Sequence, residues 1–234
     1  MKLDTIKVVS YNIRHARGTD DKVKLSRIAG VLACSGGQLI GLQEVDKHLP
    51  RSFCFNQPKR VGGLLRKNWV FGPNLKWAPW GQYGNAVLSV WPVARSKQHL
   101  LPSRGEQRGL LEVEVNMGRE RVFFFCTHLG LNREERLEQV EEILKIIDQC
   151  GKPSILVGDF NDGRSSREFA LLSGVLRDAT GISGGFNTFP SPQPEEQLDF
   201  IFVSPQWQVI AARPIISQAS DHLPVLVELG LNSS

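Results

Sequence analysis

Carboxylate and amide side chains stand directly after three apolar runs of this sequence. Asp159 and Asn161 follow residues 154–157, a short apolar run that indicates a strand buried on both faces. Asn12 and Glu44 follow two further runs in the same way. Such oxygen ligands, without cysteine, favour a hard divalent cation such as Mg²⁺ or Mn²⁺. Each position taken alone is also compatible with an ordinary surface turn, in which Asp and Asn are common.

Two later features concern histidine. Asp199 is a lone acid in the apolar run 198–203, and a buried acid is costly unless it is paired or hydrogen-bonded. Such acids often orient a histidine, and His222 directly follows Asp221 before the last apolar run. An edge-strand acid facing water and a surface turn are the alternative interpretations. A zinc site would need more His or Cys than this pattern offers, although His128 and His222 keep it open.

These residue types suffice for a phosphate-ester hydrolase. One or two hard cations would neutralise the phosphate, and a histidine held by a buried acid would deprotonate water. A second histidine or a hydrated metal would assist the leaving oxygen, and amides would donate hydrogen bonds to the phosphoryl oxygens. The sequence contains no G-x-x-x-x-G-K-[ST], G-x-G-x-x-G or G-x-S-x-G, so nucleotide-switch, dinucleotide and serine-hydrolase functions lack support.

The elements that position these residues form two strand–helix–strand units. In the first, strands are predicted at residues 5–11 and 38–43, around a helix whose apolar residues recur at helical spacing over 25–32. The same order recurs as strand 121–127, helix 132–149 and strand 154–157.

The spacing of the polar positions repeats with the elements. From Asn12 to Glu44 is 32 positions (44 − 12), and from His128 to Asp159 is 31 (159 − 128). Because chemistry in such sheets collects beyond the carboxyl ends of strands, the repeat predicts a structural duplication that brings four polar side chains to one edge.

The remaining elements are shorter. Residues 74–84 are predicted to be an irregular loop carrying Trp77 and Trp80, which either form a stacking platform or, as we favour, cap the edge of the core. Short helices are predicted at residues 57–67 and 168–172, and strands at 85–90, 93–101, 109–116, 198–203, 206–213 and 225–229.

Length and net charge place only loose limits on the substrate and on the number of domains. The 234 residues carry a net charge of +4, with 28 Lys and Arg against 24 Asp and Glu, which suits an anionic substrate without requiring one. No linker or low-complexity segment occurs, so a single domain over residues 1–234 is expected, as a monomer.

The cysteines and the apolar runs indicate the cellular compartment in which the protein is expected. None of the four cysteines forms a C-x-x-C pair, and Cys34 and Cys126 lie in apolar segments, so buried free thiols are expected. That suits a reducing compartment, and no signal peptide or run of about 18 apolar residues is present. We therefore expect a cytoplasmic protein without a transmembrane segment.

Seven short motifs occur in order along the chain. They are Tyr11-Asn12-Ile13, Gln43-Glu44-Val45, Gly84-Asn85-Ala86, Thr127-His128-Leu129, Gly158-Asp159-Phe160-Asn161, Leu198-Asp199-Phe200-Ile201 and Ser220-Asp221-His222-Leu223-Pro224. Any one of them is weak. Together, from about residue 5 to residue 229, they resemble the endonuclease/exonuclease/phosphatase superfamily, which includes pancreatic deoxyribonuclease, apurinic endonucleases, neutral sphingomyelinases and inositol-polyphosphate phosphatases.

The resemblance implies a fold and a metal site. The fold would be the DNase I-like four-layer α/β/β/α sandwich, of the α/β (α+β) class. Glu44 would be the principal ligand of Mg²⁺ (or Mn²⁺), with Asn12 and Asp221 nearby.

The resemblance also implies catalytic roles. His222 would be the catalytic imidazole and Asp199 would orient it, while Asp159 and Asn161 would position the attacking water and the phosphate. His128 would stabilise the phosphate or aid the leaving group. Further phosphate contacts would come from Asn85, Arg108 and Arg14.

One position departs from part of the superfamily. Apurinic endonucleases carry an acid two residues after the motif Asn, where this chain has Arg14, and a basic residue there is similar to the deoxyribonuclease and phosphodiesterase branches. Thr188-Phe189-Pro190 and the sequence of residues 127–131 resemble small bacterial members and the sphingomyelinase-like branch.

Three functions remain as alternatives. The leading one is a phosphodiesterase or nuclease, for which Arg51, Lys59, Arg60, Arg66 and Lys67 would supply a basic strip. A sphingomyelinase-like or inositol-phosphate-type enzyme acting on a lipid or small-molecule headgroup would instead use an apolar rim, which Trp77, Trp80 and Leu75 would supply. The remote alternative is a non-catalytic binding module on the same fold.

Overall fold

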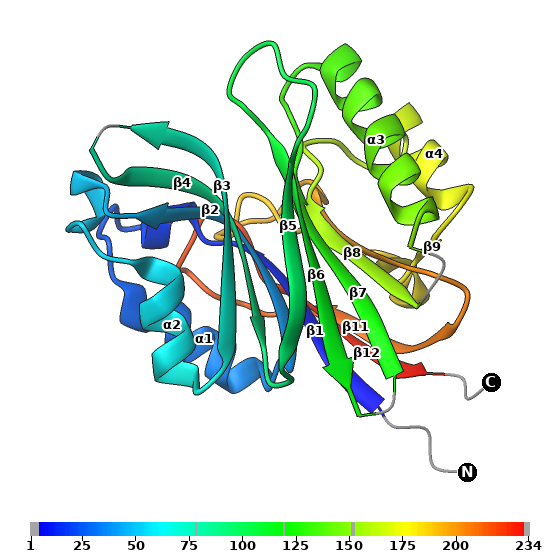
Figure 1. Cartoon of the computed structure of the whole chain (residues 1–234), viewed down its shortest axis with the longest axis horizontal. Helices are drawn as coiled ribbons and strands as arrows, with labels where there is room; N and C mark the ends of the chain where they lie inside the picture. Colours follow the sequence, from blue (N-terminus) through cyan, green and yellow to red (C-terminus); the bar gives the residue numbers. More distant parts are fainter. Residues whose placement is uncertain (1–4, 78, 119, 151–152, 232–234) are drawn as a thin grey trace.

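Two mixed sheets stack face to face, and helices cover their outer faces (Figure 1). This computed structural model describes residues 5–77, 79–118, 120–150 and 153–231. The first sheet has the order β11 (Trp207–Pro214), β12 (Val225–Leu231), β1 (Thr5–Asn12), β2 (Leu39–Lys47), β4 (Gly81–Ser89), β3 (Asn68–Trp77). The second has the order β5 (Val93–Leu100), β6 (Gly109–Met117), β7 (Glu120–His128), β8 (Ser154–Asp159), β10 (Asp199–Val203), β9 (Arg177–Asp178). The predicted four-layer sandwich is confirmed.

The two sheets repeat one pattern. In each, a parallel pair (β1 with β2, or β7 with β8) joined by a helix is flanked on both sides by antiparallel neighbours. The joining helices are α1 (Leu25–Ser35) and α3 (Arg133–Asp148). The structural duplication predicted from the spacing is therefore present: Asn12, His128 and Asp159 end β1, β7 and β8, and Glu44 lies three residues before the end of β2.

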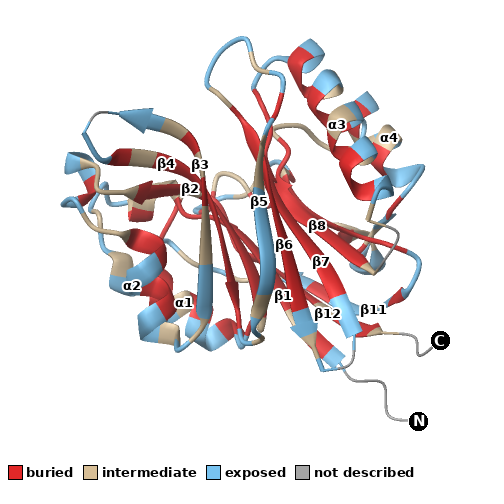
Figure 2. Cartoon of the chain, viewed as in Figure 1, coloured by how far each residue is buried: buried red, intermediate tan, exposed pale blue. Residues whose placement is uncertain are grey.

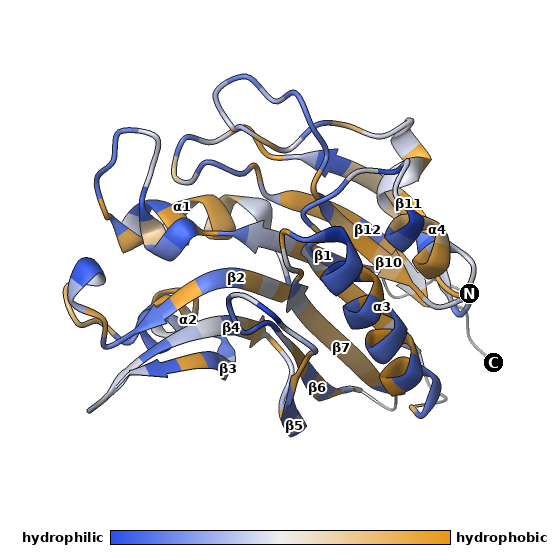
Figure 3. Ribbon diagram, turned by 90° about the horizontal axis from the view of Figure 1, so that it is seen from above, coloured by the Kyte–Doolittle hydropathy of each residue, from blue (hydrophilic) through white to orange (hydrophobic). Residues whose placement is uncertain are grey.

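Helices form the outer layers because each presents one apolar face. In α3, the Asn132 side chain caps the first turn by accepting a hydrogen bond from the backbone N–H of Glu135 at 3.1 Å. Val140, Ile143 and Ile147 are buried against the second sheet, and Figure 3 shows α3 beside the hydrophobic strand β7. The shorter helices α2 (Gln57–Leu65) and α4 (Arg167–Ser173) pack next to α1 and α3 respectively.

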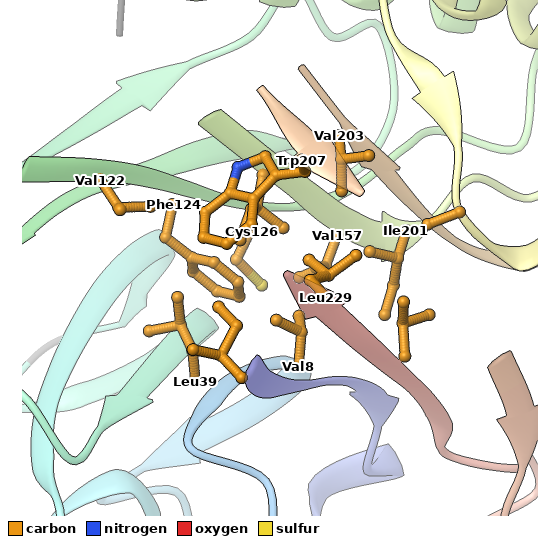
Figure 4. Packing of buried hydrophobic residues seen from close by; sticks show 14 of the residues in the cluster. Val8, Leu39, Val122, Phe124, Cys126, Val157, Ile201, Val203, Trp207 and Leu229 are labelled. Carbon is orange, nitrogen blue, oxygen red and sulfur yellow. The ribbon is translucent and has the colours of Figure 1, made fainter. Parts of the chain in front are cut away.

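The main core lies between the sheets. Alternate residues of the inner strands interdigitate there, including Val8, Phe124, Val157 and Trp207 (Figure 4). Figure 2 shows the inner strands buried along most of their length, whereas the edge strand β5 is largely exposed. The sandwich therefore fixes the strand ends on which the candidate site is built.

Gly41 marks the closest approach of the two sheets. A Cβ added there would collide with a Val157 methyl and lie 3.0 Å from Sγ of Cys126, and neither neighbour can move within the core. We expect Gly41→Ala to lower the free energy of unfolding by about 1–3 kcal/mol, measured by urea unfolding. Gly30→Ala is the matched control, because no atom lies within 4 Å of its added Cβ on α1. It should stabilise the protein by up to about 1 kcal/mol, and equal losses for both variants would contradict this packing argument.

Three predictions are wrong in detail. Residues 74–84 are not an irregular loop, because they complete the β3–β4 hairpin. Trp77 and Trp80 do not cap the core, since Trp80 is 72% exposed and Trp77 is also exposed. Cys34 is exposed, whereas Cys126 is buried as expected.

The first and last strands of the sheet lie side by side. β1 pairs antiparallel with β12 from Thr5 opposite Gly230 to Ser10 opposite Val225. The start of β1 and the end of β12 therefore lie at the same end of the sandwich (Figure 1). Within the described residues, no helix is both long and apolar enough to span a membrane.

Candidate active site

Asn12 joins the two sheets at the candidate site. Nδ2 of Asn12, at the end of β1, donates to Oε1 of Glu44 at 3.0 Å and to Oδ2 of Asp159 at 2.9 Å. Asn12 and Asp159 are fully buried, and Glu44 is partly exposed. The predicted convergence of these three positions is therefore what the structure contains.

A β-bulge places Glu44. The pairing of β2 with β4 shifts between Leu42 and Val45, and Glu44 has a φ of 57°. A non-glycine residue in this left-handed region costs of order 1–3 kcal/mol, and bulges of this kind re-aim side chains beside functional sites. β2 continues to Lys47, so the prediction that the strand ends at Glu44 is wrong, and the bulge is the reason.

A left-handed turn follows Asn12. Arg14, His15 and Ala16 have φ values of 43°, 44° and 69°, which is costly for residues that carry a Cβ. Oδ1 of Asn12 accepts a hydrogen bond from the Arg14 N–H at 3.1 Å. Nε2 of Gln57 donates to the His15 carbonyl at 2.8 Å and so supports the turn from the other side. The turn sets the Arg14 guanidinium 3.2 Å from Oδ2 of Asp221.

Three carboxylates crowd the strand ends. Burial raises the pKa of Glu44, the neighbouring Asp159 and Asp221 raise it further, and the hydrogen bond from Asn12 only partly offsets them. A divalent cation would relieve this repulsion, and all the donors are oxygen, so the residues present fit Mg²⁺ or Mn²⁺.

A second acidic group lies beside the first. Within the described residues, ligand atoms of Asp159, Asp199 and His222 lie within 4.8 Å of one another. Such a group could hold a metal ion. However, Nδ1 of His222 lies 2.8 Å from Oδ2 of Asp199, so that nitrogen is already engaged. We therefore interpret Asp199 and His222 as a hydrogen-bonded pair rather than as two ligands.

The Asp199–His222 pair is buried and tightly supported. Oγ1 of Thr188 accepts from the Asp199 N–H at 3.4 Å, and the Phe189 ring centroid lies 4.8 Å from that of His222. Burial by itself lowers the pKa of His222, but Asp199 and Asp159 outweigh it and raise that pKa to about 10. Nε2 of His222 lies 3.6 Å from Oδ2 of Asp159.

The second histidine has the opposite electrostatics. Burial, with Arg108 and His222 nearby, lowers the pKa of His128 to about 3 despite Asp159. Nε2 of His128 lies 3.4 Å from Oδ2 of Asp159 and 3.0 Å from Nδ2 of Asn161. A neutral imidazole can contribute to phosphate binding only by donating an N–H, not by carrying a charge.

Asn161 itself is held in the left-handed region, at a φ of 51°. Its backbone N–H donates to Oδ1 of Asp159 at 3.0 Å, and its Nδ2 donates to the Leu129 carbonyl at 2.8 Å. These bonds fix the side chain between the exits of β7 and β8, where the sequence places it.

Each of the three residues predicted to contact phosphate has a partner within the protein. Arg14 pairs with Asp221, as described above, and Arg108 pairs with Glu106 at 2.8 Å while its Nε has no partner among the described residues. Nδ2 of Asn85 donates to the carbonyls of Gly109 and Cys126 at 3.0 and 3.3 Å. Both amide hydrogens of Asn85 are thus engaged with backbone, and its role as a phosphate contact stays a prediction.

Sequence reasoning missed the residues that support the site. Arg136 donates to the Leu131 carbonyl at 2.7 Å and pairs with Asp162, so it ties the loop after β7 to the loop after β8. It also donates to Glu168 of α4 at 3.0 Å. Thr188 and Phe189 were recognisable as a motif, but nothing in it indicated contact with the Asp199–His222 pair.

A groove opens from the site at Asn161. It has a volume of about 690 Å³ and is lined by polar residues that include Asp162, Arg164, Asn187, Glu195 and Glu196. Arg164 is paired with Asp178, so the groove presents more uncompensated negative than positive charge. This wall of the site would repel a long polyanion.

Known proteins resemble this chain in sequence and fold. The sequence profile of the "Endonuclease/Exonuclease/phosphatase family" matches residues 9–222. YbhP of Escherichia coli K12 is 29% identical over 184 residues, which are 73% of this chain and 72% of YbhP.

Two solved structures are similar in fold. An endonuclease/exonuclease/phosphatase from Beutenbergia cavernae DSM 12333 has a TM-score of 0.85 and 24% identity, covering 98% of this chain and 72% of its own. The mannosyl-6-phosphatase Bt3783 of Bacteroides thetaiotaomicron VPI-5482 has a TM-score of 0.77 and 21% identity, covering 96% and 99%. At these identities the likeness shows the fold alone.

Proposed function

The chain belongs to the endonuclease/exonuclease/phosphatase family, and we propose that it is a divalent-metal-dependent phosphodiesterase. Members of this family are generally hydrolases of phosphate esters. The observation that carries the proposal is the pair of hydrogen bonds from Asn12, which hold Glu44 and Asp159 together at the mouth of a site that also contains a buried Asp–His pair.

The proposed metal ligands are Glu44, Asn12 and Asp221. Mg²⁺ or Mn²⁺ bound there would neutralise phosphoryl charge and lower the pKa of a bound water. Asp199 and Asp159 raise the pKa of His222 to about 10, and a cation bound at Glu44, Asn12 and Asp221 would lower that pKa, because nearby positive charge disfavours the imidazolium.

The proposed catalytic groups surround the attacking water. Nε2 of His222 takes the proton of the water, while Asp199 at Nδ1 fixes the tautomer and orients the ring. Asp159 and Asn161 position the water and the phosphate for in-line attack. His128 donates an N–H toward the phosphate or the leaving oxygen.

A small-molecule or lipid headgroup is the second candidate substrate class, in place of nucleic acid. The acidic groove beside Asn161 favours it, because a long polyanionic strand would meet Glu195 and Glu196. The name of the structurally similar mannosyl-6-phosphatase adds a sugar phosphate, and thus a monoester, to the candidates.

Metal removal tests the reaction class. We expect hydrolysis of bis-p-nitrophenyl phosphate with Mg²⁺ or Mn²⁺, complete loss in EDTA and recovery when excess Mg²⁺ is added, followed by absorbance. Activity that persists unchanged in EDTA would sink the proposed metal role. A protein that hydrolyses no phosphate ester with any divalent metal would instead favour the non-catalytic binding module.

A substrate panel separates the two candidate classes. It contains plasmid DNA, abasic DNA, RNA, sphingomyelin, phosphatidylinositol phosphates and phosphomonoesters, each with Mg²⁺ and with EDTA. Preferential cleavage of the small or lipid esters agrees with the acidic groove, whereas cleavage of abasic DNA alone would contradict the interpretation of Arg14.

The setting of the enzyme is part of the proposal. We place residues 1–234 in a single domain that acts as a monomer in the cytoplasm. Its support is the absence of a linker in the sequence and the four free cysteines, which suit a reducing compartment.

A further inference from the structure

An arginine on the Glu44 side of the site is held in one orientation by a buried acid. Nε and Nη2 of Arg51 donate to the two carboxylate oxygens of Asp46, at 2.9 and 2.7 Å. The Asp46 side chain is 0% exposed, whereas that of Arg51 is 48% exposed. The pair therefore joins a fully buried carboxylate to a guanidinium that reaches solvent.

Stability does not explain this arrangement. Burying a carboxylate is costly, and an ion pair with a half-exposed partner returns little of that cost. The pair does hold the Arg51 side chain in one orientation, because a bidentate contact fixes the plane of the guanidinium. The guanidinium also lies 5.2 Å from the ring centroid of Tyr83, the residue paired with Asp46 across the two strands.

The fixed guanidinium lies next to the candidate metal ligand. Asp46 is two residues beyond Glu44 on β2, and Arg51 is held directly against Asp46. Its Nη1 has no hydrogen-bond partner among the described residues. A donor is thus presented at the edge of the site with its direction already set.

His15, on the left-handed turn after Asn12, has a second group that is unpartnered among the described residues. Nδ1 of His15 is buried and has no partner in the described part of the chain. Gln57 links His15 to Asp46, the acid that holds Arg51. Its Nε2 donates to the His15 carbonyl at 2.8 Å, and its Oε1 accepts from the Asp46 N–H at 2.9 Å. The left-handed turn and the Arg51–Asp46 pair are therefore one connected wall.

We propose that Arg51, together with His15, forms a second anion subsite for a phosphate or carboxylate of the substrate other than the scissile phosphate. This rests on the proposed function, since the scissile phosphate lies at Glu44 and Asn12. The acidic groove lies on the Asn161 side of the site and Arg51 on the Glu44 side, so a substrate with a second anionic group would bind in one orientation only. The second anion is either part of a small bisphosphate or the flanking phosphate of a short nucleotide.

Binding of matched ligands tests the subsite. Dissociation constants are measured by isothermal titration calorimetry in Mg²⁺ for glycerol 1-phosphate, fructose 1,6-bisphosphate and the dinucleotide pTpT. We expect Arg51→Gln to weaken a ligand with two anionic groups about tenfold, and glycerol 1-phosphate less than about twofold. Whichever of fructose 1,6-bisphosphate and pTpT binds the wild type more tightly identifies the source of the second anion.

Control variants separate the subsite from folding and from catalysis. Arg95→Gln removes another exposed arginine that is paired with a buried acid, Glu112 at 3.0 Å, and should leave every constant unchanged. Arg51→Lys keeps the charge but lacks the fork, so we expect an intermediate loss. Asp46→Asn combined with Arg51→Gln leaves no buried charge unpaired, and it should fold and show the same selective loss as Arg51→Gln.

The outcomes distinguish this subsite from the proposed function. Equal weakening of one-anion and two-anion ligands, or no weakening of either, would overturn the subsite. A selective loss in a protein that hydrolyses nothing would keep the subsite and reject the phosphodiesterase. Hydrolysis of bis-p-nitrophenyl phosphate with unselective binding would do the reverse.

Discussion

Replacement of His222 by alanine is expected to lower kcat for bis-p-nitrophenyl phosphate about 10³-fold, with little change in KM. The imidazole is the one group in the site that pairs with a buried carboxylate at Nδ1 and keeps Nε2 near Asp159. Removing it takes away the proton acceptor without touching the proposed metal ligands. Steady-state kinetics with saturating Mg²⁺ measure the effect.

The Asp199 partner makes this prediction stricter. Asp199→Asn should lower kcat about 10²-fold, because the amide can leave the imidazole in the wrong tautomer. Since Asp199 acts through His222, the double variant should be no worse than His222→Ala alone. His99→Gln alters a His–carboxylate pair outside the candidate site, with Glu112 at 2.7 Å, and should leave kcat unchanged. Additive losses in the double variant would mean that Asp199 has a role independent of the histidine.

Replacement of Glu44 by glutamine is expected to move activity and stability in opposite directions. Activity should fall at least about 10²-fold, because an amide is a poorer ligand for a hard cation than a carboxylate. Stability of the metal-free protein should rise at neutral pH. Burial and two neighbouring carboxylates raise the pKa of Glu44 in the folded state, which means that folding opposes its ionised form. The neutral amide removes that penalty and can still accept from Asn12.

Thermal unfolding in EDTA and in Mg²⁺ measures the second effect. The wild type should gain more from Mg²⁺ than Glu44→Gln does, because only a protein that binds the ion is stabilised by it. Glu142→Gln on the exposed side of α3 is the matched control and should change neither quantity. A Glu44→Gln protein that keeps full activity and full stabilisation by Mg²⁺ would show that the metal is bound elsewhere.

Much of the fold was predictable because the spacing of apolar residues along the chain indicates its helices and strands. The two strand–helix–strand units, with α3 the clearest helix, follow from apolar spacing, and Gly36 ends α1 as expected. The β3–β4 hairpin was not predictable in the same way. Pro73, Gly81 and Gly84 are turn-like residues, and they are strand residues here because the pairing of β4 with both β2 and β3 overrides their local preference.

The candidate site divides along a similar line. Residues at strand exits, such as Asn12 and Asp159, were found because topology alone brings strand ends to one edge. The bulge at Glu44 was invisible, since a one-residue shift in register leaves no mark in a single sequence. The Arg51–Asp46 pair and its link to His15 through Gln57 were also missed, because they depend on how loops fold over the sheet rather than on any periodic pattern.

Because β1 pairs with β12, the first sheet can be completed only after residue 231 has been synthesised. The second sheet has all its strands once residue 203 is made, but the first sheet lacks the strand beside β1 until residue 231. From Asp159 to His222 is 63 residues (222 − 159), or roughly 3–13 s of translation at 5–20 residues per second. During that interval the nascent chain holds Asn12, Glu44 and Asp159 without His222. The proposed site is therefore complete only when the last strand closes the sheet around the first.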